Sequence, residues 1–126
     1  MIHDDLEAAC RILVDQGLCS GEGLPLRLSA TLDMANSDYL VTEENGTIVG
    51  VTLSVFDGFS SFVSHMAVAP GAERRHIGRQ MIDDLVRRTR ERGGKNIVVA
   101  SWLSAAGFYY SMDFRMPGAV FLVRDV

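Results

Sequence analysis

The sequence predicts a single α/β domain built on a mixed sheet, and three observations support this expectation. Stretches with apolar residues three and four positions apart, typical of helices, alternate with short β-branched stretches typical of strands. Glu44-Asn45-Gly46 lies between two strand-like runs, and an Asn-Gly turn is the strongest short-range signal of a β-hairpin. The 126 residues contain no repeat, linker or low-complexity segment, so we expect one domain over residues 1–126.

The first half of the chain predicts two helices and a hairpin. From Asp4 to about Gln16 apolar residues recur at helical spacing, and the pattern stops at Gly17. "LPLRLSATLDMA" predicts a second helix, whose ends Pro25 and the serines leave open. "DYLVTEENGTIVGVTLSVF" then contains the two strands of the hairpin.

The second half predicts three strands separated by two helices. "SSFVSHMAVA" indicates a strand that a Pro-Gly pair ends. A helix follows from about Gly78 to Arg90, with one apolar stripe and a Gly-Gly pair at its end. "NIVVAS" predicts a buried strand, "SAAGFYYSM" a short helix and "AVFLVRDV" a terminal strand. This order of elements describes a mixed α/β sheet.

Charge is distributed unevenly along a chain whose formal net charge is −4. Residues 1–45 carry nine acids against Arg11 and Arg27, whereas residues 74–95 carry eight bases. One short basic block lacks the broad basic face that nucleic acid requires, so we expect no nucleic-acid partner. The charges instead suit an anionic ligand at the basic block and a cationic one near the acidic half.

Composition favours a globular protein without a membrane partner. No run approaches the roughly 18 apolar residues of a membrane span. The amino terminus "MIHDDLEAAC" is acidic and lacks the apolar core of a signal peptide, so we expect a cytoplasmic location. Cys10 and Cys19 lack both the CxxC spacing and neighbouring histidines, so we expect free thiols and no metal.

The stretch "VAPGAERRHIGRQMI" runs from a strand into a helix and predicts a phosphate site. Free backbone N–H groups at a helix start, strengthened by the helix dipole, bind anions. Gly78 would let a phosphate approach the backbone closely. Three arginines add positive charge at this end: Arg74, Arg75 and Arg79. The alternative is a solvated basic turn, and the stretch has neither the Gly-Lys-Ser/Thr nor the three spaced glycines of other phosphate loops.

This stretch resembles the pyrophosphate loop of the GNAT superfamily of acetyl-CoA-dependent N-acyltransferases. In that family a strand ends in Val-x-Pro, and Arg-x-x-Gly-x-Gly opens a long helix. Aligned from Pro70, this sequence has Glu73 at the arginine, His76 at the first glycine and Gly78 at the second. We expect His76 to be tolerated if its φ is negative, and Glu73 to repel a pyrophosphate unless it turns outward.

A second GNAT signature, Asn-x-x-Ala-x-x-Phe/Leu-Tyr and then Gly-Phe, is similar to "WLSAAGFYYSMDF". The sequence departs from it at Trp102 and Asp113, and matches it at four positions: Ala105, Phe108, Tyr109 and Phe114. "YLVTEENGTIVGVTLS" also resembles the family's second and third strands, so the resemblance spans about residues 38–115. It implies a mostly antiparallel sheet with a splayed parallel strand pair, flanked by about four helices.

The resemblance also implies a reaction, in which an acceptor amine attacks the thioester of acetyl-CoA directly. The pantetheine arm would lie along the strand that carries Met66, Ala67 and Val68. The remaining donor contacts would come from Arg74, Arg75, His76, Ile77, Gly78, Arg79 and Ala105. Tyr109 stands at the family position of the acid that protonates the leaving thiolate, and its alternative role is that of a packed core aromatic.

The general base is less clear from the sequence. The strand positions that carry the base in many relatives correspond here to Phe62 and Ser64, neither of which is a strong base. Ser64 could order a water, with Asp57 or an acid of the first helices as the final proton acceptor. His65 is adjacent, but regular strand alternation would turn its side chain to the opposite face.

Two hypotheses from different classes follow. The leading one is an N-acetyltransferase that uses acetyl-CoA, without a metal, and acetylates a small amine that the acidic half predicts to be cationic. The alternative is a non-catalytic acyl-CoA-binding or interaction module, which Glu73, Trp102 and the missing strand base favour. The strand that the family has before its first helix is missing, so we expect a homodimer that covers the open sheet edge or exchanges the terminal strand.

Overall fold

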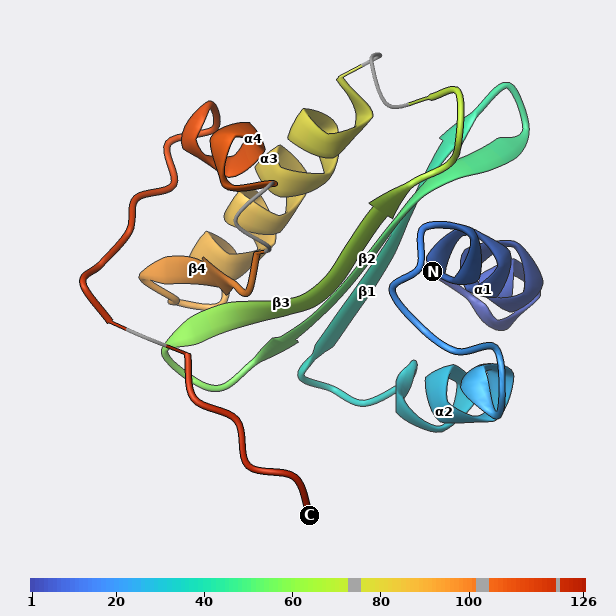
Figure 1. The fold of residues 1–126 in the computed structure, drawn as a ribbon, viewed down its shortest axis with the longest axis horizontal. Coiled ribbons are helices and arrows are strands. Elements are labelled where there is room, and N and C mark those ends of the chain that lie inside the picture. Colours follow the sequence, from blue (N-terminus) through green and yellow to red (C-terminus); the bar gives the residue numbers. More distant parts are fainter. Residues whose placement is uncertain (73–75, 102–104, 120) are drawn as a thin grey trace.

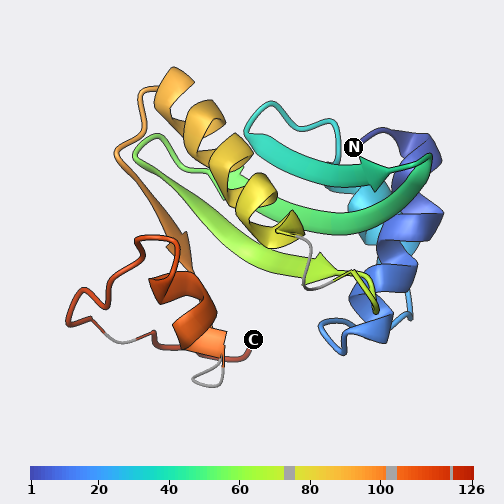
Figure 2. The ribbon, with the colours of Figure 1, turned by 90° about the horizontal axis from the view of Figure 1, so that it is seen from above.

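The computed structural model describes residues 1–72, 76–101, 105–119 and 121–126. A four-stranded sheet in the order β1-β2-β3-β4 forms its middle layer (Figure 1). Helices α1 (Leu6–Asp15) and α2 (Leu24–Thr31) lie on one face of the sheet, and α3 (Ile77–Glu91) lies on the other (Figure 2). This arrangement confirms the mixed α/β prediction.

The amino-terminal hairpin forms where the Asn-Gly pair predicts it. Strands β1 (Ser37–Glu44) and β2 (Thr47–Phe56) pair in antiparallel fashion around Asn45 and Gly46. Both turn residues have positive φ, 53° and 80°, which is the backbone that a two-residue hairpin turn of the favoured twist requires.

Strand β3 (Ser60–Val68) pairs with β2 in antiparallel fashion and with β4 (Asn96–Val99) in parallel fashion. The parallel ladder covers only the first four residues of β3 and ends where Val63 faces Val99. The remainder of β3 continues to Val68 with no β4 beside it. The sheet is therefore mostly antiparallel with a splayed parallel pair, as predicted.

Each face of the sheet carries its own apolar cluster. On one face α1 and α2 pack against β2 and β3, and the buried residues are Ala9, Cys10, Ile12, Leu13, Leu24, Leu28, Val51, Leu53 and Ala67. On the other face α3 packs against β2 through Val49, Ala72, Ile77 and Met81. The helical spacing of apolar residues in α1 and α3 thus reports the faces that are buried.

Two predictions about the second half of the chain are wrong. Strand β4 is not buried, since Val98 keeps 44% of its surface exposed. Of the predicted terminal strand, the described residues 119 and 121–126 form no strand, and Leu122 is 85% exposed. An alternating apolar pattern predicts strand propensity, but a strand also needs a ladder partner, and this segment has none among the described residues.

The short helix α4 (Ala106–Tyr110) lies where it was expected, and a 3-10 turn (His3–Asp5) precedes α1. None of the described helices combines the length and the apolar character that crossing a bilayer demands.

Candidate active site

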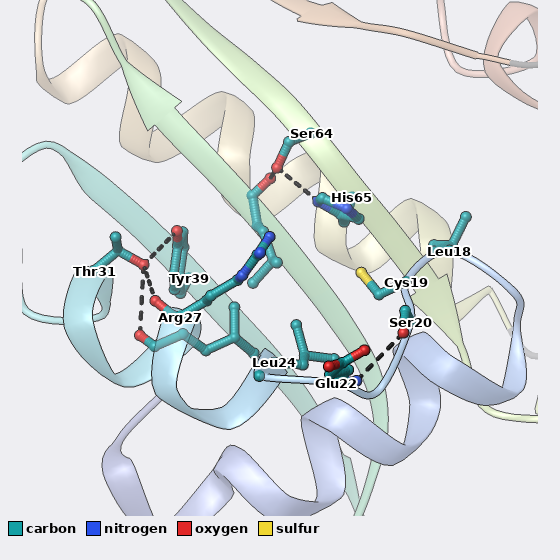
Figure 3. Close-up of a pocket in the computed structure, with 13 residues that line it drawn as sticks. Leu18, Cys19, Ser20, Glu22, Leu24, Arg27, Thr31, Tyr39, Ser64 and His65 are labelled. Atoms are coloured by element: carbon teal, nitrogen blue, oxygen red, sulfur yellow. Dashed lines mark hydrogen bonds between the residues drawn. The ribbon is translucent and has the colours of Figure 1, made fainter. Parts of the chain in front are cut away.

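An open pocket of about 910 Å³ lies between α2 and the sheet (Figure 3). The connection from α1 to α2 supplies one wall, with Leu18, Cys19, Ser20, Glu22 and Gly23. Helix α2 supplies a second wall, with Leu24, Arg27, Leu28 and Thr31. The sheet supplies the floor, with Tyr39, Leu53, Ser64 and His65.

Ser64 and His65 both line this pocket because β3 contains a β-bulge at Ser64. His65 pairs with Leu53 and Val63 pairs with Ser54, so Ser64 is an extra residue between two consecutive pairs. A bulge breaks the alternation of side chains. The expectation that His65 faces away from Ser64 is therefore wrong.

The hydrogen bonds around His65 indicate how its ring is protonated. Ser64 Oγ donates to the Leu53 carbonyl at 3.3 Å and lies 2.9 Å from His65 Nδ1. With its own proton directed to Leu53, Ser64 Oγ accepts from Nδ1–H, which leaves Nε2 with a free lone pair. Burial lowers the pKa of His65 below its ordinary 6.5, so the ring is neutral at neutral pH. His65 is thus a neutral imidazole that can accept a proton.

Asp57, the other acceptor that the sequence offers, is less suited to this task. Its Oδ1 accepts from the backbone N–H groups of Phe59 and Ser60, both at 2.8 Å. These hydrogen bonds to the carboxylate lower the pKa of Asp57, which makes it a weaker base. It is also not among the described residues that line the pocket.

The pocket carries balanced charge rather than an acidic wall. Among the described lining residues, Glu22 is the one carboxylate and Arg27 the one guanidinium. Tyr39 and Thr31 share a hydrogen bond of 2.9 Å and add neutral polar groups. Cys19 is a free thiol, and burial raises its pKa, so it stays protonated at neutral pH. The other acids of residues 1–45 lie outside the described lining.

A second feature, the open edge of β3, lies next to the pocket on the same strand. Ala69 donates to the Val49 carbonyl at 2.7 Å, and alternate residues of an antiparallel ladder share this direction. Ala67 accordingly pairs toward β2, and its side chain is buried in the core. The backbone groups of Met66 and Val68 point to the other edge, beyond the end of β4.

One polar side chain already reaches this edge. Gln16, at the end of α1, donates from Nε2 to the Val68 carbonyl at 2.9 Å. A carbonyl oxygen has two lone pairs, so Val68 can still accept a second donor. The sequence gives no signal for this contact, because Gln16 and Val68 are far apart in the chain.

Two features of the start of α3 concern the predicted phosphate site, the backbone at His76 and the packing around Gly78. His76 is the N-cap of α3 and has φ 61°, so it takes the left-handed backbone and does not meet the condition of a negative φ under which it would replace glycine without strain. Gly78 does not leave open space, since a Cβ there would lie 2.5 Å from Phe108 and 3.5 Å from Met66. Ile77 is buried beside it. Arg79 donates to the Ser111 carbonyl at 3.0 Å and so joins α3 to the end of α4.

Helix α4 holds Tyr109 between two aromatic rings. Its ring centroid lies 5.1 Å from that of Phe108 and 5.4 Å from that of Phe114, both in edge-to-face geometry. Burial raises the pKa of Tyr109, so the phenol keeps its proton across the physiological range. Ala105 is the N-cap of this helix. Tyr109 does not belong to the described lining of the pocket.

Several predicted residues lie outside the described residues. These are Arg74 and Arg75 of the basic loop, with Glu73, and Trp102 before α4. Among the residues that the structure does describe, no three His, Cys, Asp or Glu side chains gather as a metal site would need.

The sequence itself matches a family. The model of the acetyltransferase (GNAT) domain covers residues 25–125. The chain belongs to the GNAT family. This membership confirms the predicted fold and the predicted class of N-acetyltransferases. No curated protein matches the chain at the sequence level.

Solved structures of other GNAT proteins share this fold over nearly their whole length. A ribosomal-protein-alanine N-acetyltransferase from Brucella melitensis biovar Abortus 2308 superposes with a TM-score of 0.80 at 15% identity, over 100% of this chain and 96% of its own. A predicted acetyltransferase from Clostridium acetobutylicum, solved with acetyl-CoA, has a TM-score of 0.78 at 18% identity. The superposition covers 98% of this chain and 92% of that protein. An aminoglycoside antibiotic 6'-N-acetyltransferase from Acinetobacter haemolyticus has a TM-score of 0.84 at 10% identity. The superposition covers 100% of this chain and 96% of that protein.

Proposed function

We propose that this GNAT domain transfers an acetyl group from acetyl-CoA to the primary amine of a small acceptor in the pocket. One observation carries the proposal: β3 borders both places where substrates would bind. Its bulge places Ser64 and His65 in the pocket, and its open edge at Met66 and Val68 lies directly beyond. A donor along that edge and an acceptor in the pocket would meet at one strand.

The donor fits the described residues in part. The backbone groups of Met66 and Val68 are placed to hydrogen-bond a pantetheine arm as an added strand would. The first N–H groups of α3, from Ile77, Gly78 and Arg79, would face the pyrophosphate. Bound there, acetyl-CoA supplies a thioester carbon to which the amine nitrogen bonds while the C–S bond breaks.

His65 would take the proton that the amine must lose. An alkylammonium has a pKa of about 10, so at neutral pH a base must remove a proton before or during attack. Nε2 of the neutral ring has a lone pair for this purpose, and Ser64 holds Nδ1 in the matching tautomer. Ser64 therefore serves as a positioning residue, or orders a water between the amine and the ring.

Tyr109 would return a proton on the donor side. The thiolate of a departing alkyl thiol has a conjugate-acid pKa of about 8.5, below that of a phenol, so its own proton affinity does not drive this transfer alone. Burial also raises the pKa of Tyr109, so the transfer is favoured only where the departing thiolate is more strongly desolvated than the phenolate that forms. The burial of Tyr109 between Phe108 and Phe114 supports a phenol held in a desolvated site.

The alternative remains a GNAT-fold module that binds acyl-CoA without turnover. The contact between Gln16 and Val68 does not separate it from the enzyme, because acyl-CoA would use the same strand edge in both cases. The charge of residues 1–45 predicts a cationic acceptor. In the described lining, Glu22 is the one carboxylate with which the cation could pair.

Calorimetric titration with acetyl-CoA, followed by an assay of CoA release with a panel of amines, tests the proposal. We expect micromolar binding that Tyr109→Phe leaves unchanged, and turnover that this variant lowers about 10- to 1,000-fold. Binding without turnover of any amine would support the module instead. An absence of binding at millimolar acetyl-CoA would refute both readings.

A further inference from the structure

The pocket contains a guanidinium that the proposed reaction does not use. Arg27 extends from α2 toward the strand that carries Ser64 and His65 (Figure 3). Within the described residues, Arg27 makes no ion pair and no side-chain hydrogen bond. Arg11 on the neighbouring helix, in contrast, lies 3.3 Å from Glu7. A guanidinium directed into a concave site with its donors unused is suited to bind an anion.

We propose that the acceptor is an amino acid or a closely related zwitterion, whose carboxylate binds Arg27 while its amine faces His65. This inference rests on the proposed function and names its substrate class. A guanidinium presents a planar fork of N–H donors that matches the two oxygens of a carboxylate. A pocket that holds both this fork and a neutral imidazole base can orient both ends of one small molecule.

The charge of the pocket favours a zwitterion over a polycation. Glu22 and Arg27 are its two charged side chains among the described residues, so with His65 neutral this described part of the lining has no net charge. A polycationic acceptor would be attracted by the one carboxylate, Glu22, and repelled by the one guanidinium, Arg27. An amino acid brings equal and opposite charges, so its net charge matches that of the lining.

The position of Arg27 also indicates where the carboxylate and the amine of the acceptor would lie in the pocket. His65 is partly buried on the pocket floor, whereas Arg27 comes from the α2 wall and is an exposed residue. The carboxylate would therefore lie on the α2 side and the amine on the β3 side, beside the open edge of that strand. Glu22 lies on the loop beside Ser20 and would face the acceptor side chain (Figure 3).

Paired acceptors test this inference. Each pair is an amino acid and its amide, which carry the same side chain and differ in the carboxylate: alanine and alaninamide, phenylalanine and phenylalaninamide. Acetyl-CoA is the donor, and kcat/KM is measured for the wild type, for Arg27→Gln and for Arg27→Lys. Amides have less basic amines, but this difference cancels when the acid-to-amide ratio is compared between protein variants.

We expect the acid-to-amide ratio to fall about tenfold or more in Arg27→Gln, as the loss of a hydrogen bond between charged groups predicts. Arg27→Lys keeps the charge but loses the fork, and should give an intermediate ratio. Arg11→Gln removes an exposed arginine outside the pocket and should leave the ratio unchanged. An unchanged ratio in Arg27→Gln, or a polyamine that outperforms every amino acid, would overturn the inference.

A binding measurement separates this inference from the proposed function. N-acetylalanine and N-acetylalaninamide are titrated calorimetrically into protein saturated with CoA. Preference for the acid that Arg27→Gln abolishes supports the inference even if no amine is acetylated, in which case only the catalytic proposal fails. Equal binding of both, or binding of neither, overturns the inference even if other amines are acetylated.

Discussion

A left-handed backbone occurs at His76 and Asp113, with φ of 61° and 67°. Both positions correspond to glycines in the GNAT motifs that the sequence resembles. Glycine reaches this conformation without steric cost, whereas a residue with a Cβ pays about 1 kcal/mol or more. These two departures from the motifs therefore preserve the backbone path and lower stability.

Replacing Asp113 or His76 by glycine should stabilise the domain. Relief of the left-handed strain outweighs the added freedom of the unfolded chain, for a gain of about 0.5–1 kcal/mol each. Thermal unfolding should show this as a rise in Tm of roughly 2–5 °C. Asp113→Ala and His76→Ala are the matched controls, because alanine removes the side chain but keeps the strain. Glycine variants no more stable than the alanine variants would contradict the argument.

The pH dependence of turnover should reflect the protonation of His65. A neutral base that receives a proton from an ammonium gives a kcat/KM that is flat between the two pKa values and falls below that of the base. Since burial lowers the pKa of His65, the fall should begin below pH 6.5, its ordinary value. The wild-type profile should therefore be flat through neutral pH.

His65→Gln should change the shape of this profile as well as its height. Without the base only free amine reacts, so kcat/KM should rise steadily with pH toward the pKa of the amine, near 10. His3→Gln, which changes an exposed histidine paired with Asp33, should keep the wild-type shape. A flat profile in His65→Gln would exclude His65 as the base.

The same shift links pH to stability. The folded protein binds its proton at His65 less tightly than the unfolded chain does, so the stabilising contribution of the neutral ring is complete above pH 6.5. It is lost as the pH falls below that value.

At the scale of elements, the edge of β3 is shared between Gln16 and the proposed donor. Gln16→Ala removes a donor that already occupies Val68, and we expect acetyl-CoA to bind a few-fold more tightly, as a net hydrogen bond of about 1 kcal/mol allows. Calorimetric titration measures this change. Gln80→Ala, on α3, is the control. Weaker binding by Gln16→Ala would show that the amide organises the edge instead of competing for it.

The elements that local chemistry determines could be predicted from the sequence. The hairpin follows from Asn45 and Gly46, whose backbone only a few residue types adopt readily. Helix α3 spans Ile77–Glu91 against a predicted range of Gly78 to Arg90, because its apolar stripe has a clear helical period. The predicted Tyr109 lies on α4 as the family motif implies.

The bulge and the exposure of β4 could not be predicted. Serines occur on β3 both at the buried Ser61 and at the exposed Ser64, so the sequence of this strand shows no clean alternation from which a shift could be read. Whether β4 is buried depends on what pairs with its outer edge, which a local pattern does not report. The pocket residues Arg27 and Glu22 were missed for a similar reason, since only tertiary contacts bring α2 to the sheet.

At the scale of the whole molecule, the carboxyl-terminal segment exposes apolar surface. Phe121 stacks on Phe62 at 5.9 Å, but Leu122 and Val123 are 85% and 78% exposed. Figure 1 shows this segment running away from the sheet, while β4 has no partner on its outer edge among the described residues. Exposed apolar segments and open edges are commonly covered by association.

We therefore predict a homodimer in which this segment pairs with a second copy. Light scattering at micromolar concentration should give twice the chain mass of 13.8 kDa. Leu122→Lys should shift the protein toward monomer, whereas Leu26→Lys, at an exposed position on α2, should not. A monomeric wild type at these concentrations would rule the dimer out.

The extra residue at Ser64 makes this point of β3 tolerant of changes in chain length. In an ordinary strand a one-residue deletion turns every following side chain to the opposite face of the sheet, and the packing of the core is lost. Here Val63 and His65 already face consecutive residues of β2, so removing Ser64 would leave both halves of the strand in phase. The floor of the pocket can thus vary by deletion as well as by substitution, while the apolar layers on either side of the sheet stay as they are.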